Sequence, residues 1–402
     1  MKLSPLALFF AGLLATAWQF PILSSREGLG RGMETVAIAR TLAQEGRFAN
    51  PFGVETGATA QQAPLYPAIL ATILKIAGEG TAAGTAIVLL AFLFHALQYP
   101  LLPILSDQLF HSRQPGYWAC LWLAVIPTMK IYLAWADASL IALAVMAWCA
   151  AFHGPAAAQR SVAAGATAGL VLLLHPAAGA VLLPWFVVSI WSSGQRWRKL
   201  PLFAAMAAAV CLPWTLRNTA ELGDFVPIRD NFGLELQVSN NDLAAPQLLR
   251  NQAAQRAFHP NENPSEAARM KSTGELPYFR EKGREAWAWI GANTPKFLQL
   301  TAARIREFWL PDPALNGSTA WSASLLTLLS AAGLLIRRRS AGWKYALPVL
   351  LFFPLPYYLV QADIRYRMPV LWLSLLPAGI VLEHSACRIK VWLFGIRNSF
   401  RA

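Results

Sequence analysis

The sequence predicts an all-α, polytopic membrane protein of about ten transmembrane helices. Of its 402 residues, 56% are hydrophobic and only 14% are charged, whereas soluble domains carry about 25% charged residues. The apolar residues form long runs separated by short polar links, which is the pattern of membrane-spanning helices. A transmembrane β-barrel would show short alternating segments instead, and the sequence lacks them.

The first apolar run covers about residues 4–23 and is interpreted as an uncleaved span, because it is long and shows no clear small-residue cleavage site. The loop after it, residues 24–81, contains two amphipathic stretches, one from Glu34 to Glu45 and one from Pro64 to Gly78. Each is shorter than the roughly 20 residues that a bilayer crossing requires. We therefore expect both stretches to be helices that lie in the membrane interface.

The remaining apolar runs predict nine further spans. They cover about residues 82–106, 115–131, 136–152, 161–174, 177–193, 200–214, 318–336, 343–361 and 368–384. We divide the chain into a transmembrane module (1–214), a polar segment (215–316) and C-terminal helices with a basic tail (317–402). The polar segment contains 12 Lys/Arg and 12 Asp/Glu residues, a balance that indicates a folded, mostly helical segment outside the membrane.

Basic residues predict the orientation of these spans. The run Arg337–Arg339 and the basic tail are placed inside the cell, because cytoplasmic loops are enriched in Lys and Arg. Counting spans back from there places the 24–81 loop, the 215–316 segment, Asp137 and the link 362–369 together on the outer side. The formal charge of +13 is therefore assigned to cytoplasmic loops and not to nucleic-acid binding.

Other familiar site motifs are lacking in the sequence. The four cysteines lie within or beside apolar runs and form no CxxC pair, so we expect neither a zinc site nor a disulfide framework. The sequence contains no GxGxxG, Walker or HExxH motif, which argues against a soluble nucleotide-sugar or ATP site.

The first loop carries the most informative motifs. METVAIARTLAQEGRFANPFG (33–53) and TGATAQQAPLYPAILA (56–71) resemble the first outer loop of the GT-C superfamily, the integral-membrane glycosyltransferases that include protein O-mannosyltransferases and aminoarabinose transferases. Glu34 matches the acidic position of that loop, where the family usually has an Asp-Glu pair, and the turn 63–67 matches its proline-containing turn. Segments 212–242, 259–290 and 363–369 resemble those of a bacterial subgroup, so that the resemblance covers most of the chain.

The resemblance implies a glycosyltransferase of a bacterial inner membrane whose active site faces the periplasm. Such an enzyme moves a sugar from a polyprenyl-phosphate-linked donor to an extracytoplasmic protein, lipid or glycan acceptor. A divalent metal is a possible cofactor, although nothing in the sequence requires one. Neither the sugar nor the acceptor is indicated.

Two acidic residues are candidate catalytic residues. Glu34 would act as the general base that takes the acceptor proton; the alternative is that it only starts a helix, where acidic residues are favoured. Asp137, at the start of the fourth span, would be a second carboxylate or a metal contact; the alternative is a helix cap.

Six residues are candidates for substrate binding. Arginines on the outer side suit the phosphate of the donor because their forks donate paired hydrogen bonds, and the alternative is contact with lipid headgroups. The candidates are Gln61, Tyr66, Arg217, Arg229, Arg365 and Arg367. His175, in a turn between two spans, is interpreted as a structural residue.

Two other functions stay open at this stage. A lipid-linked sugar flippase or transporter would require broken helices and polar groups at the middle of the membrane, whereas the polar groups here gather on one side. An inactive scaffold of a surface-polysaccharide complex would bind a lipid-linked donor without turnover.

Overall fold

The structure is a computed structural model that describes residues 3–17, 33–125, 136–194 and 196–399. Within them every regular element is a helix, and the only β contacts are two isolated bridges. The all-α prediction is therefore confirmed. The end of the first predicted span (18–23), the start of the first loop (24–32) and the end of the third span (126–131) lie outside the described residues.

A helix is present at the described part of each predicted span. These helices are α1 (Pro5–Ala17), α5 (Thr81–Ala96), α6 (Gln98–Phe110), α7 (Gln114–Val125), α9 (Ala136–Ala151), α10 (Ser161–Leu174), α11 (Gly179–Ile190), α12 (Arg196–Leu222), α18 (Pro313–Ile336), α19 (Gly342–Phe352), α20 (Leu355–Leu359) and α21 (Trp372–Ser399). Short 3-10 helices occur at η1 (Pro155–Arg160), η2 (Pro176–Ala178), η3 (Trp191–Ser193) and η4 (Ile364–Val370). α12 continues past position 214, where we placed the end of the transmembrane module.

Not every one of these helices is long enough to cross a bilayer by itself. Among the described residues, four segments are long and apolar enough, at Thr81–Phe110, Pro155–Leu174, Trp197–Leu222 and Pro313–Ile336, and η4 with α21 adds a fifth that is bent by 76°. Three other predicted spans coincide with the shorter apolar helices Pro5–Ala17, Ala136–Ala151 and Pro176–Ile190, and the described parts of the remaining two contain α7, α19 and α20. A polytopic membrane fold is thus confirmed, and the count of ten crossings stays a prediction.

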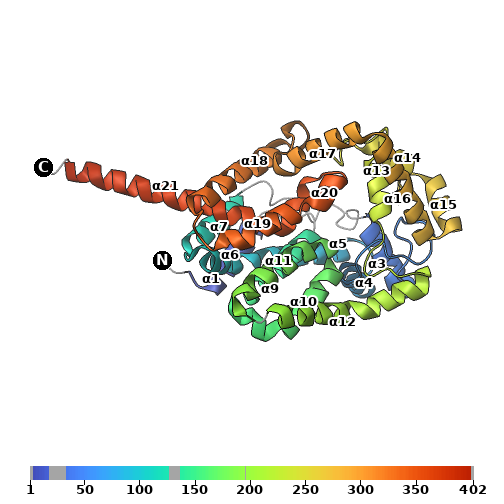
Figure 1. Ribbon diagram of the computed structural model, residues 1–402, viewed down its shortest axis with the longest axis horizontal. Coiled ribbons are helices and arrows are strands. Elements are labelled where there is room, and N and C mark those ends of the chain that lie inside the picture. Colours follow the sequence, from blue (N-terminus) through green and yellow to red (C-terminus); the bar gives the residue numbers. More distant parts are fainter. Residues whose placement is uncertain (1–2, 18–32, 126–135, 195, 400–402) are drawn as a thin grey trace.

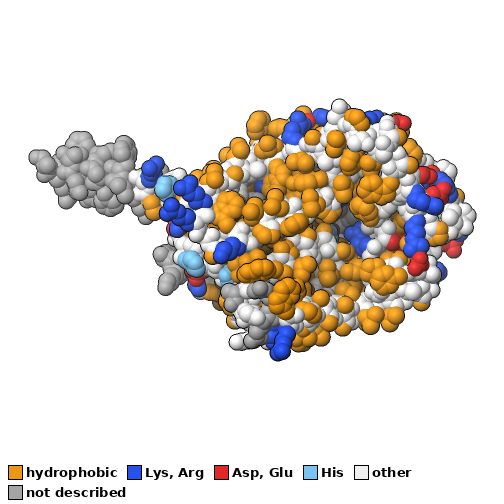
Figure 2. All heavy atoms as spheres, viewed as in Figure 1, with side chains coloured by type: hydrophobic (Ala, Val, Ile, Leu, Met, Phe, Trp, Pro, Cys, Tyr) orange, Lys and Arg blue, Asp and Glu red, His pale blue; other side chains and the backbone are white. Residues whose placement is uncertain are grey.

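Close packing joins the apolar helices through glycines. A Cβ on Gly333 of α18 would lie 1.8 Å from the Pro377 carbonyl oxygen of α21, and a Cβ on Gly379 of α21 would lie 2.1 Å from the Pro115 carbonyl oxygen of α7. Small residues allow such approaches in membrane bundles. Leucines on the outside of the same helices are exposed, for example Leu14 and Leu328. Figure 2 shows hydrophobic side chains gathered over the middle of the molecule and charged side chains towards its two ends.

The predicted loop helices form as α3 (Met33–Glu45) and α4 (Leu65–Ala77). Val36 and Ala39 of α3 pack with Leu70 and Leu74 of α4 in a small hydrophobic cluster that also includes Ile87 of α5. This cluster fixes the first loop to the end of an apolar helix.

The polar segment is mostly helical, as expected. It contains α13 (Phe232–Ser239), α14 (Gln252–Phe258), α15 (Pro264–Thr273), α16 (Glu275–Ala292) and α17 (Thr294–Trp309). Figure 1 shows α13 to α16 beside α3 and α4 at one end of the molecule, whereas α21 projects from the other end. Phe52 of the first loop packs into the hydrophobic cluster formed by α13 and α16, with Leu234, Val238 and Phe279. The first loop and the polar segment thus form one structural unit.

Candidate active site

A cavity of about 740 Å³ lies where this unit meets the ends of the apolar helices. Its walls come from the starts of α3 and α9, the turn before α11, α13, α14 and the segment around η4. The first loop, the polar segment, Asp137 and the link 362–369, which were all predicted to lie on one side of the membrane, therefore meet at one cavity. Which side of the membrane this is stays a prediction.

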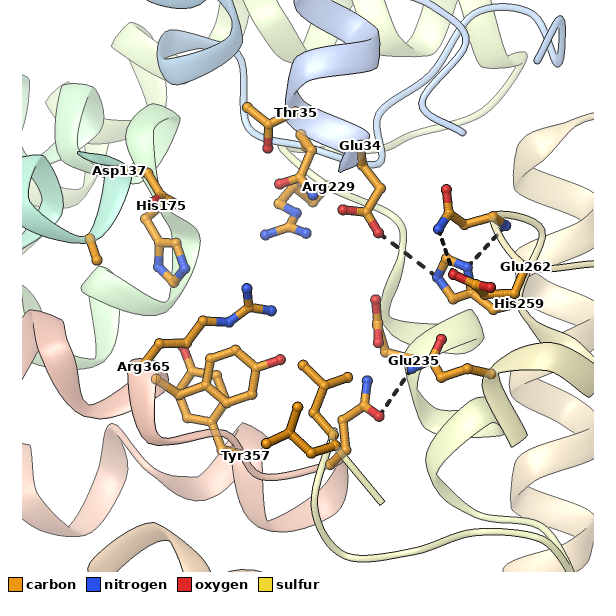
Figure 3. Close-up of a pocket in the computed structure, with 18 of the residues that line it drawn as sticks. Glu34, Thr35, Asp137, His175, Arg229, Glu235, His259, Glu262, Tyr357 and Arg365 are labelled. Carbon is orange, nitrogen blue, oxygen red and sulfur yellow. Dashed lines mark hydrogen bonds and ion pairs between the residues drawn. The ribbon is translucent and has the colours of Figure 1, made fainter. Parts of the chain in front are cut away.

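Two arginines face each other across the cavity (Figure 3). The Nε of Arg229 donates a hydrogen bond of 2.9 Å to the backbone carbonyl of Gln61, and its terminal nitrogens point into the cavity. Arg365 enters from η4, with its Nε 3.9 Å from a carboxylate oxygen of Asp363. A third arginine, the exposed Arg256 of α14, also lines the cavity.

The charges of both arginines persist at neutral pH. Burial lowers the pKa of Arg229, against the opposing effect of the Glu235 and Glu34 carboxylates. Burial alone would lower the pKa of Arg365 as well, but Tyr366 and Asp363 raise it above its usual value. Because an arginine pKa lies far above 7, both guanidinium groups carry a positive charge at the cavity.

Two carboxylates, Glu34 and Glu235, also line the cavity, and Glu34 lies beside Arg229 (Figure 3). Glu34 is in the first turn of α3, and its side chain is 27% exposed. Glu235 is in the first turn of α13 and also lines the cavity. Burial raises the pKa of Glu235, an effect that His259, Arg229 and Arg365 reduce. The lining therefore brings arginines and carboxylates together, with Glu34 beside Arg229 and Glu235 towards His259 (Figure 3).

His259 follows the end of α14 and is buried against Glu34. Its Nε2 lies 4.0 Å from Glu34 Oε1, and its Nδ1 accepts a hydrogen bond of 3.1 Å from the backbone N–H of Asn261. Its ring packs edge-on against Phe52, with 5.3 Å between the ring centroids.

A buried polar network holds the wall formed by α14 and the end of α20. Arg304 of α17 donates hydrogen bonds to Asn240 Oδ1 (3.1 Å) and to the Leu359 carbonyl (2.9 Å). The side-chain oxygen of Gln361 accepts from Asn251 (3.0 Å) and from Gln255 (3.1 Å) of α14. Since these groups are tied to several helices, the wall is rigid.

Besides Arg229, four further residues that were named from the sequence line the cavity. These are Glu34, Asp137, His175 and Arg365. Asp137 starts α9, where the charge of Arg365 acts on it. His175 is in the turn between α10 and η2, as predicted, and it also lines the cavity.

The other four predicted residues do not line this cavity. Gln61 contributes its carbonyl to Arg229, and its own side chain is buried. Tyr66 packs between two hydrophobic clusters. Arg217 donates to the carbonyls of Thr59 (2.7 Å) and Phe48 (2.6 Å). These hydrogen bonds join the end of α12 to the backbone of the first loop.

Arg367 is likewise part of the scaffold. It is buried, and it donates hydrogen bonds to Thr327 Oγ1 (2.6 Å) of α18 and Ser374 Oγ (2.9 Å) of α21. Its guanidinium also lies over the Trp309 ring, 4.9 Å from the centroid. These contacts join η4 to the apolar helices.

Sequence reasoning missed several residues of the lining. They include Gln62, Glu235, Gln255, His259, Tyr357, Gln361 and Tyr366. Tyr357 and Tyr366 stack on each other at 4.6 Å, on the same wall as Arg365. The turn around His259 could be recognised from the sequence. Nothing in the sequence indicated that His259 contacts the first loop. Among the described residues, no group of three His, Cys, Asp or Glu side chains is arranged to hold a metal ion.

Comparison with solved structures identifies two similar proteins. The archaeal oligosaccharyltransferase AglB from Archaeoglobus fulgidus, in complex with an inhibitory peptide and a dolichol-phosphate, matches 98% of this chain with a TM-score of 0.54 and 13% identity. The chain spans about half of that enzyme, covering 52% of its length. ArnT from Cupriavidus metallidurans, bound to undecaprenyl phosphate, matches 94% of this chain and 77% of its own chain, with a TM-score of 0.44 and 15% identity.

The likeness to AglB shows that the chain shares the fold of that enzyme over nearly its whole length. No family model and no curated protein matches the chain.

Proposed function

With the GT-C fold as the premise, we propose that this protein is a membrane glycosyltransferase that uses a polyprenyl-phosphate-linked sugar. The observation that carries the proposal is the cavity into which Arg229, Arg365 and Glu34 all point (Figure 3). A phosphate bound by the two arginines would place an attached sugar towards the carboxylates. The acceptor is an extracytoplasmic protein, lipid or glycan.

The reaction requires one proton transfer and one displacement. The hydroxyl oxygen of the acceptor attacks the anomeric carbon opposite the phosphate, while Glu34 takes the hydroxyl proton. The bond between the anomeric carbon and the phosphate oxygen breaks, and its electron pair leaves with the polyprenyl phosphate. The configuration at the anomeric carbon is inverted, and the transferred proton is carried by Glu34.

The arginines stabilise the leaving group. Negative charge grows on the phosphate as the bond breaks, and preorganised cations in a partly buried site stabilise such charge more strongly than water does. Arg229 is held by the first loop through Gln61, and Arg365 is held by Asp363. We assign Asp137, within electrostatic reach of Arg365, to orienting that arginine.

Tyr357 and Tyr366 complete the donor side. Their stacked rings offer an apolar surface beside Arg365, and aromatic rings with a polar tip suit a site that is partly wet. The exposed apolar surface of the neighbouring helices (Figure 2) would accept the polyprenyl tail from the lipid.

The proposed setting is a bacterial inner membrane with the cavity on the periplasmic side. The end of α18, which precedes the exposed Arg337–Arg339 run, lies away from α13 to α16 in Figure 1. Basic residues at one end and the cavity at the other agree with the positive-inside tendency.

The test is a screen of radiolabelled polyprenyl-phosphate sugars with the purified protein in lipid nanodiscs, with membrane extracts as the source of acceptors. We expect transfer from one donor, and we expect Glu34→Gln to bind that donor and not to transfer its sugar. Glu45→Gln, at the exposed end of the same helix, is the matched control and should remain active. Equal turnover by Glu34→Gln would refute the assignment of the base.

A further inference from the structure

We propose that His259 is the positioning residue of Glu34, and that it presents a fixed Nε2–H donor to the Glu34 carboxylate. The inference rests on the proposed function, because it assigns a role to His259 only if Glu34 is the base. In this proposal the base, Glu34, belongs to the first loop, and the residue that positions it, His259, belongs to the polar segment.

The first step concerns the tautomer of His259. Its Nδ1 accepts a hydrogen bond of 3.1 Å from the backbone N–H of Asn261. A backbone N–H can only donate, so Nδ1 carries no proton in this arrangement. In the neutral imidazole the proton is then on Nε2, which is the atom that faces Glu34 Oε1 at 4.0 Å.

The second step concerns the fixed position of the ring. The side chain is 5% exposed, and the Phe52 ring packs edge-on against it. The backbone N–H of His259 donates to the Gln255 carbonyl (2.9 Å), and its carbonyl accepts from the N–H groups of Glu262 (3.0 Å) and Asn263 (2.9 Å). The ring therefore has little freedom to turn away from Glu34.

The third step concerns which carboxylate receives the donor. Glu34 and Glu235 both line the cavity near His259. Glu34 is the carboxylate whose Oε1 faces the Nε2 of His259, at 4.0 Å, and an ionised carboxylate can only accept a hydrogen bond. Only a small closure of the 4.0 Å separation gives a hydrogen bond, as is common when a catalytic site takes up its substrate.

The experiment compares two substitutions of His259 in the full-length protein, assayed with the donor found in the screen. His259→Leu removes the donor, and we expect kcat to fall about 10- to 100-fold, the range that follows misplacement of a catalytic group. KM for the donor should change little, because the phosphate is bound elsewhere. His259→Gln keeps an N–H donor and should recover most of the rate. His384→Leu is the matched control, because it replaces a histidine by leucine at an exposed position of α21.

The outcomes separate the two proposals. A low rate for Glu34→Gln together with a normal rate for His259→Leu would overturn the role of His259 alone. Equal losses in His259→Leu and His259→Gln, or a loss of polyprenyl-phosphate binding in both, would indicate a structural role and also overturn it. A normal rate for Glu34→Gln would overturn the proposed base itself.

Discussion

Substitution of the two cavity arginines should weaken binding of polyprenyl phosphate strongly, whereas substitution of Arg217 should not. Arg229 already uses its Nε on the Gln61 carbonyl, so its two terminal nitrogens are the groups that would reach a phosphate. Arg217 directs its terminal nitrogens to the Thr59 and Phe48 carbonyls instead. Sequence alone treats these arginines alike, and the structure separates them.

The magnitude follows from the hydrogen bonds that are lost. A hydrogen bond that involves a charged group contributes about 1.5–3 kcal/mol, and one arginine fork would make one or two of them. Arg229→Gln or Arg365→Gln should therefore cost about 2–4 kcal/mol, which corresponds to roughly 30- to 1,000-fold weaker binding. Arg229→Lys keeps the charge and loses the anchoring Nε, so an intermediate loss is expected.

The assay is the Kd for a labelled polyprenyl phosphate in nanodiscs, with melting temperature as a second readout. Arg217→Gln is the matched control, because it should lower the melting temperature by removing two bonds to the first loop and leave the Kd nearly unchanged. The reasoning is refuted if both cavity variants bind like the wild type, or if Arg217→Gln weakens binding as much as they do.

Two further predictions concern the scaffold of the cavity. Burial raises the pKa of Asp230 to about 6 beside Glu275, whose pKa burial also raises; the protonated form is thus favoured in the folded state. The raised pKa of Asp230 adds to the free energy of unfolding in full below about pH 4. This stabilisation, of up to about 3 kcal/mol, is lost as the pH rises through about 6. The melting temperature of Asp230→Asn should then fall less than that of the wild type between pH 5 and pH 8, and an identical fall in both would contradict the prediction. A Cβ at Gly233 would lie 2.1 Å from the Phe279 carbonyl oxygen, so Gly233→Ala should push α13 from α16, cost about 1–3 kcal/mol and reduce kcat through displacement of Glu235. Gly291→Ala, where a Cβ has nothing within 4 Å, is the control, and equal behaviour of the two variants in thermal unfolding and turnover would show that the contact is unimportant.

The helices could be predicted well from the sequence, because each has a simple physical signal. Long apolar runs predict helices that lie in the membrane, and α3 and α4 show apolar residues at helical spacing. Helix ends were less accurate. α12 extends to Leu222, beyond the predicted end at 214, and its final turns contact the first loop through Arg217 and Leu222.

The candidate site could be predicted only in part. Glu34 stood out as an acidic residue at a helix start within a family motif. Glu235 carried no such signal, since it lies between two leucines in FGLELQVS. It reaches the cavity because Leu234 and Val238 turn the opposite face of α13 into the core of the polar segment. His259 likewise depends on the packing of Phe52, which lies about 200 residues earlier in the chain.

Arg229 and Arg217 illustrate the same limit. They are separated by 12 positions and have equal charge, but Arg217 is on the last turns of α12 and Arg229 is in the non-helical stretch before α13. Only the folded chain shows that one binds the loop and the other points into the cavity.

The most direct test of the account is a structure of the protein in nanodiscs with bound polyprenyl phosphate. We predict that the phosphate lies between the guanidinium groups of Arg229 and Arg365, on the side facing Glu34, with the isoprenoid chain running out along the apolar helices. A phosphate bound elsewhere on the protein, with this cavity unoccupied at saturating ligand, would contradict the central claim.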